Sequence, residues 1–343
     1  MTAAPLRRLC LVSRQGGIAG PATFQRRLAE GLAARGIDQC YDLRDTPYAA
    51  VLVSGGTRHL GGLHRVRRQG IPIVQRLDGM NWIHRRRRTG ARHFLRAEIN
   101  NLLLRWLRSH LADGVIYQSQ FVRRWWDETY GAVQVPSAVV HNGVSLEAFR
   151  PGEPQTESPG SRLLVVEASL AGGYETGLEH AISLLNALGA IGRPVELIVA
   201  GQVSGKVRQA SDSGSPRPIT WMGAVASPEL PRLYHTGSML FSADLHPACP
   251  NTVIESLACG TPVVAFDTGA LPELVEPSAG RLVPYGADAW KLEPPDIGGL
   301  AAAAAEVLAD LPRYRRGARA RAEAAFGLDR MVDGYLAALG WAG

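Results

Sequence analysis

Lysine and long apolar runs are both scarce in this sequence. Its 343 residues contain only Lys206 and Lys291 as lysines, so arginine carries almost all of the positive charge. No apolar run reaches the roughly 18–20 residues that a membrane-spanning helix needs. The apolar run at residues 9–12 is also too short for the core of a signal peptide. These absences predict a cytoplasmic protein without a membrane span.

Cysteine is scarce too, and the four cysteines are far apart in the sequence (Cys10, Cys40, Cys249 and Cys259). No two of them have the spacing of a metal-ligand or redox motif. We therefore expect buried free thiols in a reducing compartment, and no metal site.

The third glycine of the dinucleotide-binding fingerprint is missing. Gly16 and Gly17 stand before a predicted helix, but no spaced third glycine and no suitably placed ribose-binding acid follow them. A dinucleotide-dependent oxidoreductase is therefore a weak interpretation.

The composition, the length and the charge distribution of the sequence predict a folded protein of two domains with opposite net charge. Apolar residues make up 46% and charged residues 20% of the chain, as in globular proteins, and the length suits two domains. Residues 1–150 hold 23 arginines against 10 acidic residues, a net charge of +13, whereas residues 151–343 have a net charge of −7. The basic half suits an anionic membrane surface, an anionic acceptor or nucleic acid, or reflects an arginine-rich composition alone. No nucleic-acid-binding module accompanies the charge, so we expect no nucleic acid partner.

Short apolar segments alternate with helical patterns in both halves. This alternation predicts an α/β fold of two doubly wound, Rossmann-like domains, with ligands at the carboxyl ends of parallel strands. A stretch rich in proline and glycine at residues 150–160 reads as a linker. The predicted boundaries are 1–152 for a first domain, 153–326 for a second, and 327–343 for a C-terminal helix that packs back toward the first. The expected strands are residues 9–13, 50–54, 71–77, 114–118, 138–141, 162–167, 195–200, 219–222, 238–242, 262–266 and 281–283, and the expected helices are residues 21–35, 94–111, 120–130, 175–188, 228–235, 252–259, 297–309, 312–326 and 329–339.

The segment from His246 to Thr268 carries the clearest chemistry. A loop with two prolines precedes a helix that is expected to begin near Asn251, with the Asn251 side chain as its cap. The free N–H groups and the dipole of a helix N-terminus suit a diphosphate. Glu255 follows within the helix, where its carboxylate can accept hydrogen bonds from both hydroxyls of a ribose. The next strand ends at a second loop, which contains Thr268.

A basic, aromatic stretch covers residues 82–88 and continues into the helix at 94–111. Its arginines include four in a row at 85–88 and then Arg92, Arg96, Arg105 and Arg108, and its aromatic residues include Trp82, Phe94 and Trp106. Such a face suits peripheral contact with an anionic membrane, at its inner face, or an anionic acceptor. The alternative is a solvated helix face with aromatic side chains in the core.

Four sequence segments together resemble glycosyltransferase family 4. They are Gly16-Gly17 with the following helix and Arg35-Gly36, residues 115–121 (VIYQSQF), residues 140–151 (VHNGVSLEAFRP) and residues 255–265 (ESLACGTPVVA). They span both halves in the order of the family. The resemblance implies a retaining GT-B enzyme, with two Rossmann-like domains facing across a cleft. It also implies a nucleotide-diphosphate sugar donor, UDP- or GDP-linked, and no metal or other cofactor. The acceptor is a glycan, a lipid or a small molecule.

The resemblance also assigns roles to individual residues. Glu255 matches the glutamate that holds the nucleotide ribose, and Asp78 lies at a strand end where the family places a His or Asp near the reacting sugar. Glycines at the first loop let the substrate approach the backbone. The remaining donor-binding positions are Gly16 and Gly17 in that loop and Asn251, Thr252 and Val253 at the diphosphate. From its place at the same edge of the sheet, Thr268 is also expected to contact the donor.

The sequence departs from the family at the sugar and phosphate contacts. Pro247 stands where the family has an earlier glutamate, which leaves His246 as the nearest polar replacement. The usual Arg and Lys after the first strand of the second domain are missing, and Thr176 stands at the lysine position. Lys206, or the backbone of Gly172 and Gly173, is expected to replace them. Two hypotheses follow: an active glycosyltransferase, or a catalytically weak or inactive GT-B protein that binds nucleotide sugars or serves as a scaffold.

Overall fold

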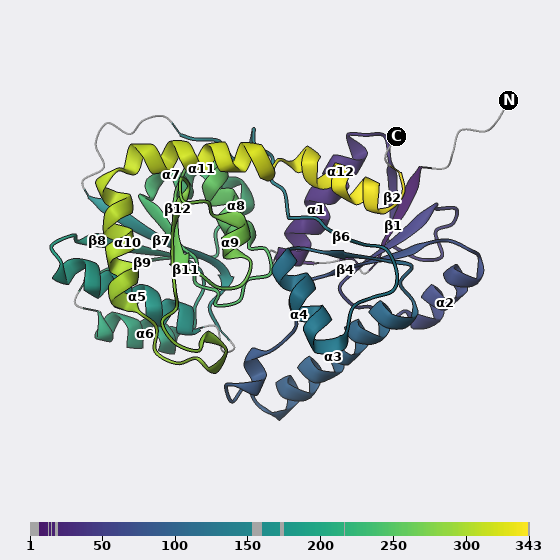
Figure 1. The fold of residues 1–343 in the computed structure, drawn as a ribbon, viewed down its shortest axis with the longest axis horizontal. Coiled ribbons are helices and arrows are strands. Elements are labelled where there is room, and N and C mark those ends of the chain that lie inside the picture. Colours follow the sequence, from purple (N-terminus) through teal and green to yellow (C-terminus); the bar gives the residue numbers. More distant parts are fainter. Residues whose placement is uncertain are drawn as a thin grey trace. The chain divides into compact units, whose positions relative to one another are not determined.

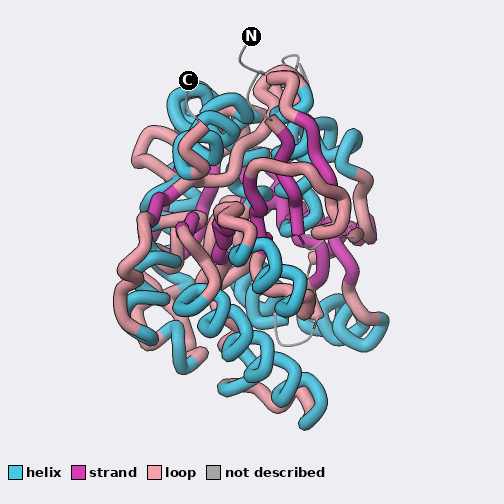
Figure 2. The backbone as a smooth tube through the Cα atoms, turned by 90° about the vertical axis from the view of Figure 1, so that its right-hand side faces the viewer, coloured by secondary structure: helices cyan, strands magenta, loops and turns pink. Residues whose placement is uncertain are grey.

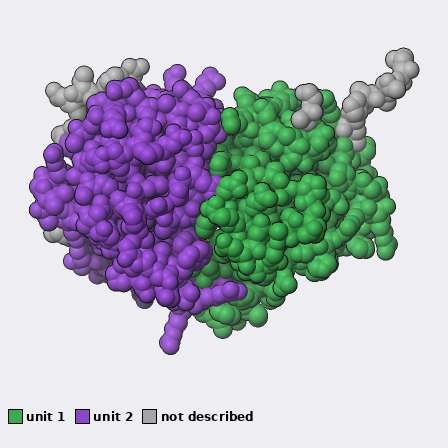
Figure 3. Space-filling model, in the orientation of Figure 1, with its two compact units in different colours: residues 1–82, 90–143, 328–343 green, residues 83–89, 144–327 purple. Residues whose placement is uncertain are grey.

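The computed structural model describes residues 7–12, 14, 16–17, 20–152, 160–171, 175–215 and 217–341. The chain forms two compact units, coloured separately in Figure 3. Unit 1 contains residues 1–82, 90–143 and 328–343, and unit 2 contains residues 83–89 and 144–327. The proposed linker lies mainly at 153–159, outside the described residues, as do Gly172 and Gly173.

Unit 1 is built on a six-stranded sheet in which all described strands are parallel. The strand order is β2-β1-β3-β4-β5-β6. Its strands are β1 (Arg8–Val12), β2 (Asp38–Cys40), β3 (Ala50–Ser54), β4 (Ile73–Leu77), β5 (Gly114–Tyr117) and β6 (Ser137–Val139). The order reverses between β1 and β3, which is the arrangement of a doubly wound sheet.

The helices of unit 1 cover this sheet (Figures 1 and 2). They are α1 (Gly20–Ala33), α2 (Leu60–Arg68), α3 (Ala91–His110), α4 (Gln120–Tyr130) and α12 (Leu328–Ala338). Phe24 and Leu28 of α1 share one buried cluster with Val332 and Tyr335 of α12. A Cβ added to Gly31 would lie 2.4 Å from Cγ2 of Val332, so the two helices need a glycine at their closest approach.

Unit 2 repeats the architecture with a second six-stranded parallel sheet, ordered β12-β11-β10-β7-β8-β9. Its strands are β7 (Ser161–Ser169), β8 (Val195–Gln202), β9 (Ile219–Gly223), β10 (Met239–Phe241), β11 (Val263–Phe266) and β12 (Gly280–Val283). Its helices are α5 (Glu175–Ala190), α6 (Gly205–Gly214), α7 (Leu230–Thr236), α8 (Asn251–Ala258), α9 (Leu271–Leu274), α10 (Ile297–Ala309) and α11 (Leu311–Ala325), with short 3-10 turns η1 (Ile83–Arg85), η2 (Ser227–Glu229) and η3 (Ala289–Lys291).

The α/β class and the predicted elements are confirmed, and the differences are local. The sequence analysis missed β2, α2, α6 and α9, which have three, nine, ten and four residues. The predicted cap Ser119 accepts a hydrogen bond from the Val122 N–H at 3.2 Å, and Gly131 ends α4 with a φ of 82°. The four cysteines are buried free thiols, as expected. No helix in the described part of the chain is long and apolar enough to cross a membrane.

Candidate functional site

Two loops meet at the carboxyl edge of the unit 2 sheet. One follows β10 and leads into α8, and the other follows β11. The Ala270 N–H donates to the Pro247 carbonyl at 2.9 Å, and a Cβ on Gly269 would lie 2.6 Å from Pro247. Because this contact leaves no room for a side chain at residue 269, the two loops form one packed surface that carries both His246 and Thr268.

The first turn of α5 packs against the same surface. A Cβ on Gly177 would lie 2.1 Å from the carbonyl oxygen of Ala243, so α5 approaches the loop after β10 backbone to backbone. Among the described residues, the buried hydroxyls of Thr176, Ser242 and Thr268 have no hydrogen-bond partner. Buried hydroxyls normally have partners, so these three are suited to a polar ligand at this edge.

Two other carboxylates, Asp244 and Glu255, act on Glu167 in this part of unit 2. Burial, then the charges of Asp244 and Glu255, raises the pKa of Glu167 to about 8. Burial also raises the pKa of Asp244. Glu255 is 3% exposed and accepts a hydrogen bond from the Tyr234 hydroxyl at 2.9 Å. Glu167 is therefore mostly protonated at neutral pH, which reduces the negative charge that a diphosphate would meet.

The raised pKa of Glu167 predicts how stability depends on pH. Between its ordinary value of 4.5 and about 8, the folded protein keeps a proton that the unfolded chain has lost. Stability therefore falls as pH rises through this window and levels off above it. Glu167→Gln should remove most of this fall, because glutamine has no proton to lose in the same pH range. Urea unfolding at a series of pH values tests this, and the exposed variant Glu147→Gln should keep the wild-type slope. A wild-type slope in Glu167→Gln contradicts the assignment.

The helix at the centre of the predicted motif differs from expectation in its cap. Pro250, not Asn251, is the N-cap of α8, and no side chain caps the helix. The prediction that the Asn251 side chain caps α8 is therefore wrong, because Asn251 already has helical geometry. The backbone N–H groups of Asn251, Thr252 and Val253 belong to the first turn of α8. In a first turn, the helix itself offers no carbonyl acceptor for the backbone N–H groups. Glu255 lies on the same helix, one turn further along.

His246 is held in a stack. Its ring lies 3.5 Å from the ring of Trp290 in η3, at an interplanar angle of 10°. The side chain is 7% exposed. Burial lowers the pKa of His246 to about 4, so the imidazole is neutral at physiological pH. A neutral imidazole can donate or accept a hydrogen bond but does not supply the positive charge that a diphosphate favours.

Asp78 lies in unit 1, directly after β4. Its carboxylate pairs with the guanidinium of Arg76 and accepts a hydrogen bond from Gln118. The Trp126 indole donates to the Asp78 carbonyl at 2.9 Å. The side chain of Asp78 is nevertheless 33% exposed. The aspartate is thus fixed in orientation while one edge of it remains accessible.

The glycines predicted for the first loop are also in unit 1. Gly16 and Gly17 are exposed, and no atom lies within 4 Å of a Cβ built on either. Gly17 has a φ of 91°, a conformation that side-chain-bearing residues rarely adopt. The backbone here is open to a ligand. The structure thus places Gly16, Gly17 and Asp78 in unit 1 and the other predicted site residues in unit 2.

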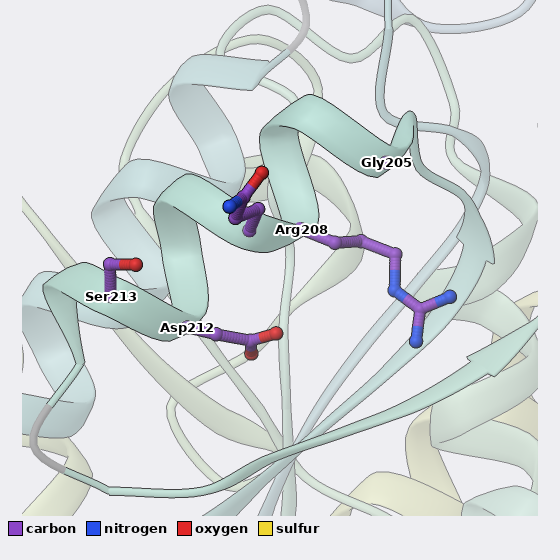
Figure 4. A pocket seen from close by; sticks show the side chains of 5 residues that line it. Gly205, Arg208, Asp212 and Ser213 are labelled. Atoms are coloured by element: carbon purple, nitrogen blue, oxygen red, sulfur yellow. The ribbon is translucent and has the colours of Figure 1, made fainter.

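Lys206 is exposed on the first turn of α6, which follows β8. The same helix lines a small surface pocket of about 550 Å³ with Gly205, Arg208, Asp212 and Ser213 (Figure 4). Asp212 accepts a hydrogen bond from the Trp221 indole of β9 at 2.9 Å. Since β7 and β8 separate β9 from β10 in the sheet, the Asp212–Trp221 end of this pocket lies away from the His246–Thr268 loops, whereas Lys206 follows the carboxyl end of β8, two strands from β10.

The basic stretch predicted as one face is divided by the structure. Arg108 is buried, with its guanidinium paired to Asp127 and bonded to the Tyr117 hydroxyl at 3.0 Å. The prediction that Arg108 belongs to an exposed basic face is therefore wrong, since that side of α3 packs on the sheet. Arg87 lies in unit 2, where it pairs with Glu175 at 3.8 Å and Glu179 at 3.4 Å.

Several residues of the site escaped the sequence analysis. Glu167, Asp244 and Trp290 were not predicted, although Glu167 lies near the end of β7 and Asp244 follows the end of β10, where ligand-contacting residues gather. Arg76 was also missed, because nothing local indicates that its side chain is buried. Among the described residues, no group of three or more His, Cys, Asp or Glu side chains could hold a metal ion.

Two family models match this chain. "Glycosyltransferase Family 4" matches residues 42–148, and "Glycosyl transferases group 1" matches residues 169–310. Together the matched ranges take in well over half of the chain and lie on both sheets. The chain belongs to glycosyltransferase family 4.

Part of this family 4 chain is similar in sequence to known glycosyltransferases. It is 31% identical over 163 residues to the D-inositol 3-phosphate glycosyltransferase of Mycobacterium marinum, and 30% identical over 173 residues to that of Mycobacterium tuberculosis. The first alignment covers 44% of this chain and 35% of the relative, and the second covers 48% and 36%. The chain thus matches about a third of the length of these relatives.

Solved structures match over nearly the whole chain. Sucrose-phosphate synthase from Thermosynechococcus elongatus has a TM-score of 0.74 at 17% identity, with 95% of this chain and 96% of that chain covered. Anabaena HepE in complex with UDP-glucose has a TM-score of 0.73 at 16% identity, with 97% and 99% covered. At this identity the likeness shows the fold, which is GT-B as the sequence predicted.

Proposed function

We propose that this family 4 glycosyltransferase transfers a sugar from a nucleotide-diphosphate donor to an acceptor. The observation that carries the proposal is the surface where α8, α5 and the loops after β10 and β11 meet. That surface combines a buried carboxylate, Glu255, a helix N-terminus and unpartnered hydroxyls. A nucleotide sugar requires these groups for its ribose, its diphosphate and its sugar hydroxyls.

Unit 2 is the proposed donor-binding side, and unit 1 is the proposed acceptor-binding side. In unit 2, Glu255 accepts hydrogen bonds from the ribose, and the backbone of residues 251–253 meets the diphosphate. Thr268 contacts the sugar, and Lys206 supplies a positive charge. In unit 1, Gly16 and Gly17 let a substrate approach the backbone.

His246 and Asp78 are the proposed residues at the reacting sugar. His246 lies in the loop where the family has a glutamate, and its neutral ring suits a hydrogen bond to a sugar hydroxyl. Asp78 is partly exposed and fixed by Arg76 and Gln118, which suits a hydrogen-bond acceptor close to the acceptor hydroxyl. Stabilisation of the leaving diphosphate by helix N–H groups is the main catalytic contribution that we expect.

The finer parts of the proposal concern substrates and place of action. The donor is a UDP- or GDP-sugar. The solved HepE complex contains UDP-glucose, which favours UDP. Transfer proceeds with retention of configuration and needs no metal. The acceptor is a glycan, a lipid or a small molecule. The protein acts in the cytoplasm, in peripheral contact with an anionic membrane, which the charge of +13 in residues 1–150 supports.

The proposal is tested by incubating the protein with UDP-, GDP-, ADP- and dTDP-sugars and following slow donor hydrolysis. We expect the protein to hydrolyse one of these donors. Hydrolysis should continue at the same rate after a metal chelator is added. The variant that tests the site is His246→Ala. It should lower the turnover of the donor more than it lowers the affinity for the nucleotide. Binding without turnover for every donor would favour the alternative of a catalytically inactive nucleotide-sugar-binding or scaffold protein. The absence of the family's Arg and Lys motivates that alternative.

A further inference from the structure

Helix α3 of unit 1 is apolar on two opposite sides. Ala97, Leu104 and Leu107 on one side are buried. On the other side, four large apolar side chains repeat at intervals of four, three and four residues, so they form one stripe about 17 Å long. This apolar stripe consists of Leu95, Ile99, Leu102 and Trp106, which are 61%, 55%, 55% and 40% exposed. A helix that meets only water does not need a second apolar side.

A basic groove lies beside the stripe. It has a volume of about 1090 Å³ and lies between α3, the loop after β3 and Asn81. Its ionisable lining residues are Arg58, His59, Arg92, His93 and Arg96, and none of the described lining residues carries a carboxylate. Leu95 and Ile99 line the groove and also begin the stripe. A site for negative charge and an apolar surface are therefore continuous within unit 1.

The arginines of α3 are arranged on both sides of the apolar stripe. On a helical projection, Arg92 and Arg96 flank the stripe on the groove side and Arg105 flanks it on the other. Arg105 also lies over the Tyr130 ring, with 5.0 Å between its guanidinium carbon and the ring centroid. Glu98 is the one acidic residue in the sequence of α3. This distribution is that of a helix that lies in the surface of an anionic bilayer, with arginines at the headgroups and apolar side chains below.

We propose that the basic groove and the apolar stripe together dock unit 1 on an anionic phospholipid surface. The headgroup phosphate binds between Arg58, Arg92 and Arg96, and the stripe enters the boundary between headgroups and acyl chains. This deepens the membrane contact proposed above by naming its residues, and it does not depend on catalysis.

Two other occupants fit the same features less well. A second copy of the chain in a two-fold dimer would bring two patches of the same positive charge together and supply no negative charge to the groove. A free phosphate compound would fill the groove but leave four large apolar side chains in water. Only an amphiphilic surface satisfies both parts.

The test is sedimentation of the full chain with vesicles. One set contains phosphatidylcholine alone, and the other contains equal parts of phosphatidylcholine and phosphatidylglycerol. We expect binding to the second set, weak binding to the first, and a fall in binding as salt is added, because screening weakens attraction between exposed charges.

Two double variants separate the groove from the stripe. Arg92→Gln with Arg96→Gln should weaken binding to anionic vesicles about thirtyfold, since each arginine near the surface contributes about a factor of five. Leu95→Asn with Leu102→Asn should weaken it about tenfold while leaving the salt dependence in place. The matched controls are Arg208→Gln and Ile191→Asn on unit 2, where Ile191 is 53% exposed, and both should bind as the wild type does.

Three results would overturn the proposal. One is equal binding to neutral and anionic vesicles. Another is displacement of the protein from vesicles by soluble glycerol phosphate, which would assign the groove to a soluble phosphate compound. The third is a concentration-dependent dimer in light scattering that Leu95→Asn abolishes, together with no vesicle binding. Donor hydrolysis in vesicle-free solution is measured separately, so failure of docking and failure of the proposed activity are distinguishable.

Discussion

Replacing Arg76 by leucine is expected to lower the free energy of unfolding of unit 1 by about 3 kcal/mol. The Arg76 side chain is 2% exposed and lies 3.7 Å from the ring centre of Phe24. It donates to the Tyr335 hydroxyl at 3.0 Å and to the Asn142 amide oxygen at 3.1 Å, and it pairs with Asp78. Leucine would remove the hydrogen bonds that the guanidinium donates to these three groups. The partial exposure of Asp78 keeps the effect at the lower end of the range for a broken buried pair.

Urea unfolding and the melting temperature measure this effect. The matched control is Arg44→Leu. Arg44 pairs with Asp42 at 2.7 Å, but the two side chains are 81% and 45% exposed. That variant should change stability by less than about 0.5 kcal/mol. If Arg76→Leu were as mild as Arg44→Leu, the buried network would not stabilise unit 1. Since Arg76 also orients Asp78, the variant should lower turnover even at temperatures where it is fully folded.

Glu255→Ala is expected to weaken nucleotide binding by about 1–3 kcal/mol, which is roughly fivefold to 150-fold. A buried carboxylate that accepts hydrogen bonds from ribose hydroxyls forms charge-assisted bonds that alanine cannot replace. The Tyr234 hydroxyl, which donates to Glu255 at 2.9 Å, loses its acceptor in the same variant. Part of the change is therefore expected in stability as well as in affinity.

Calorimetric titration of UDP and GDP into the protein measures the affinity. Tyr234→Phe separates the two effects, because it removes the same internal hydrogen bond and leaves the carboxylate available. Its nucleotide affinity should stay within about threefold of wild type, a change smaller than the net value of one hydrogen bond. Glu323→Gln, on the exposed side of α11, should leave affinity unchanged. An unaltered affinity in Glu255→Ala would remove Glu255 from the site.

Local patterns predicted much of the fold. Ser119 and Gly131 mark both ends of α4 because a cap and a left-handed glycine act within a few residues of the helix. The strands were found because buried parallel strands are short apolar runs. The short strand β2 was missed since three residues are too few to form a pattern.

Tertiary contacts account for what the sequence did not predict. The sequence of α3 shows Arg105 and Arg108 as equivalent charges, yet only Arg108 meets Asp127 and Tyr117 and is buried. Likewise, the pKa of Glu167 is raised by its burial and then by the charges of Asp244 and Glu255, which are far from it in the sequence. The stacking of Trp290 on His246 has the same origin. The pattern of residues along one helix does not show which distant residues that helix will contact in the fold.

The course of the chain through the two units has a consequence for biosynthesis. Unit 1 begins with β1 but needs α12, whose Val332 and Tyr335 complete the buried cluster around α1. All of residues 144–327 are synthesised between these two parts. A ribosome-bound chain that has emerged only as far as α11 therefore has a complete unit 2 and an unfinished unit 1, with the apolar side of α1 uncovered. We expect unit 2 to fold first although it comes second in the sequence, and the nascent unit 1 to be the part that chaperones bind.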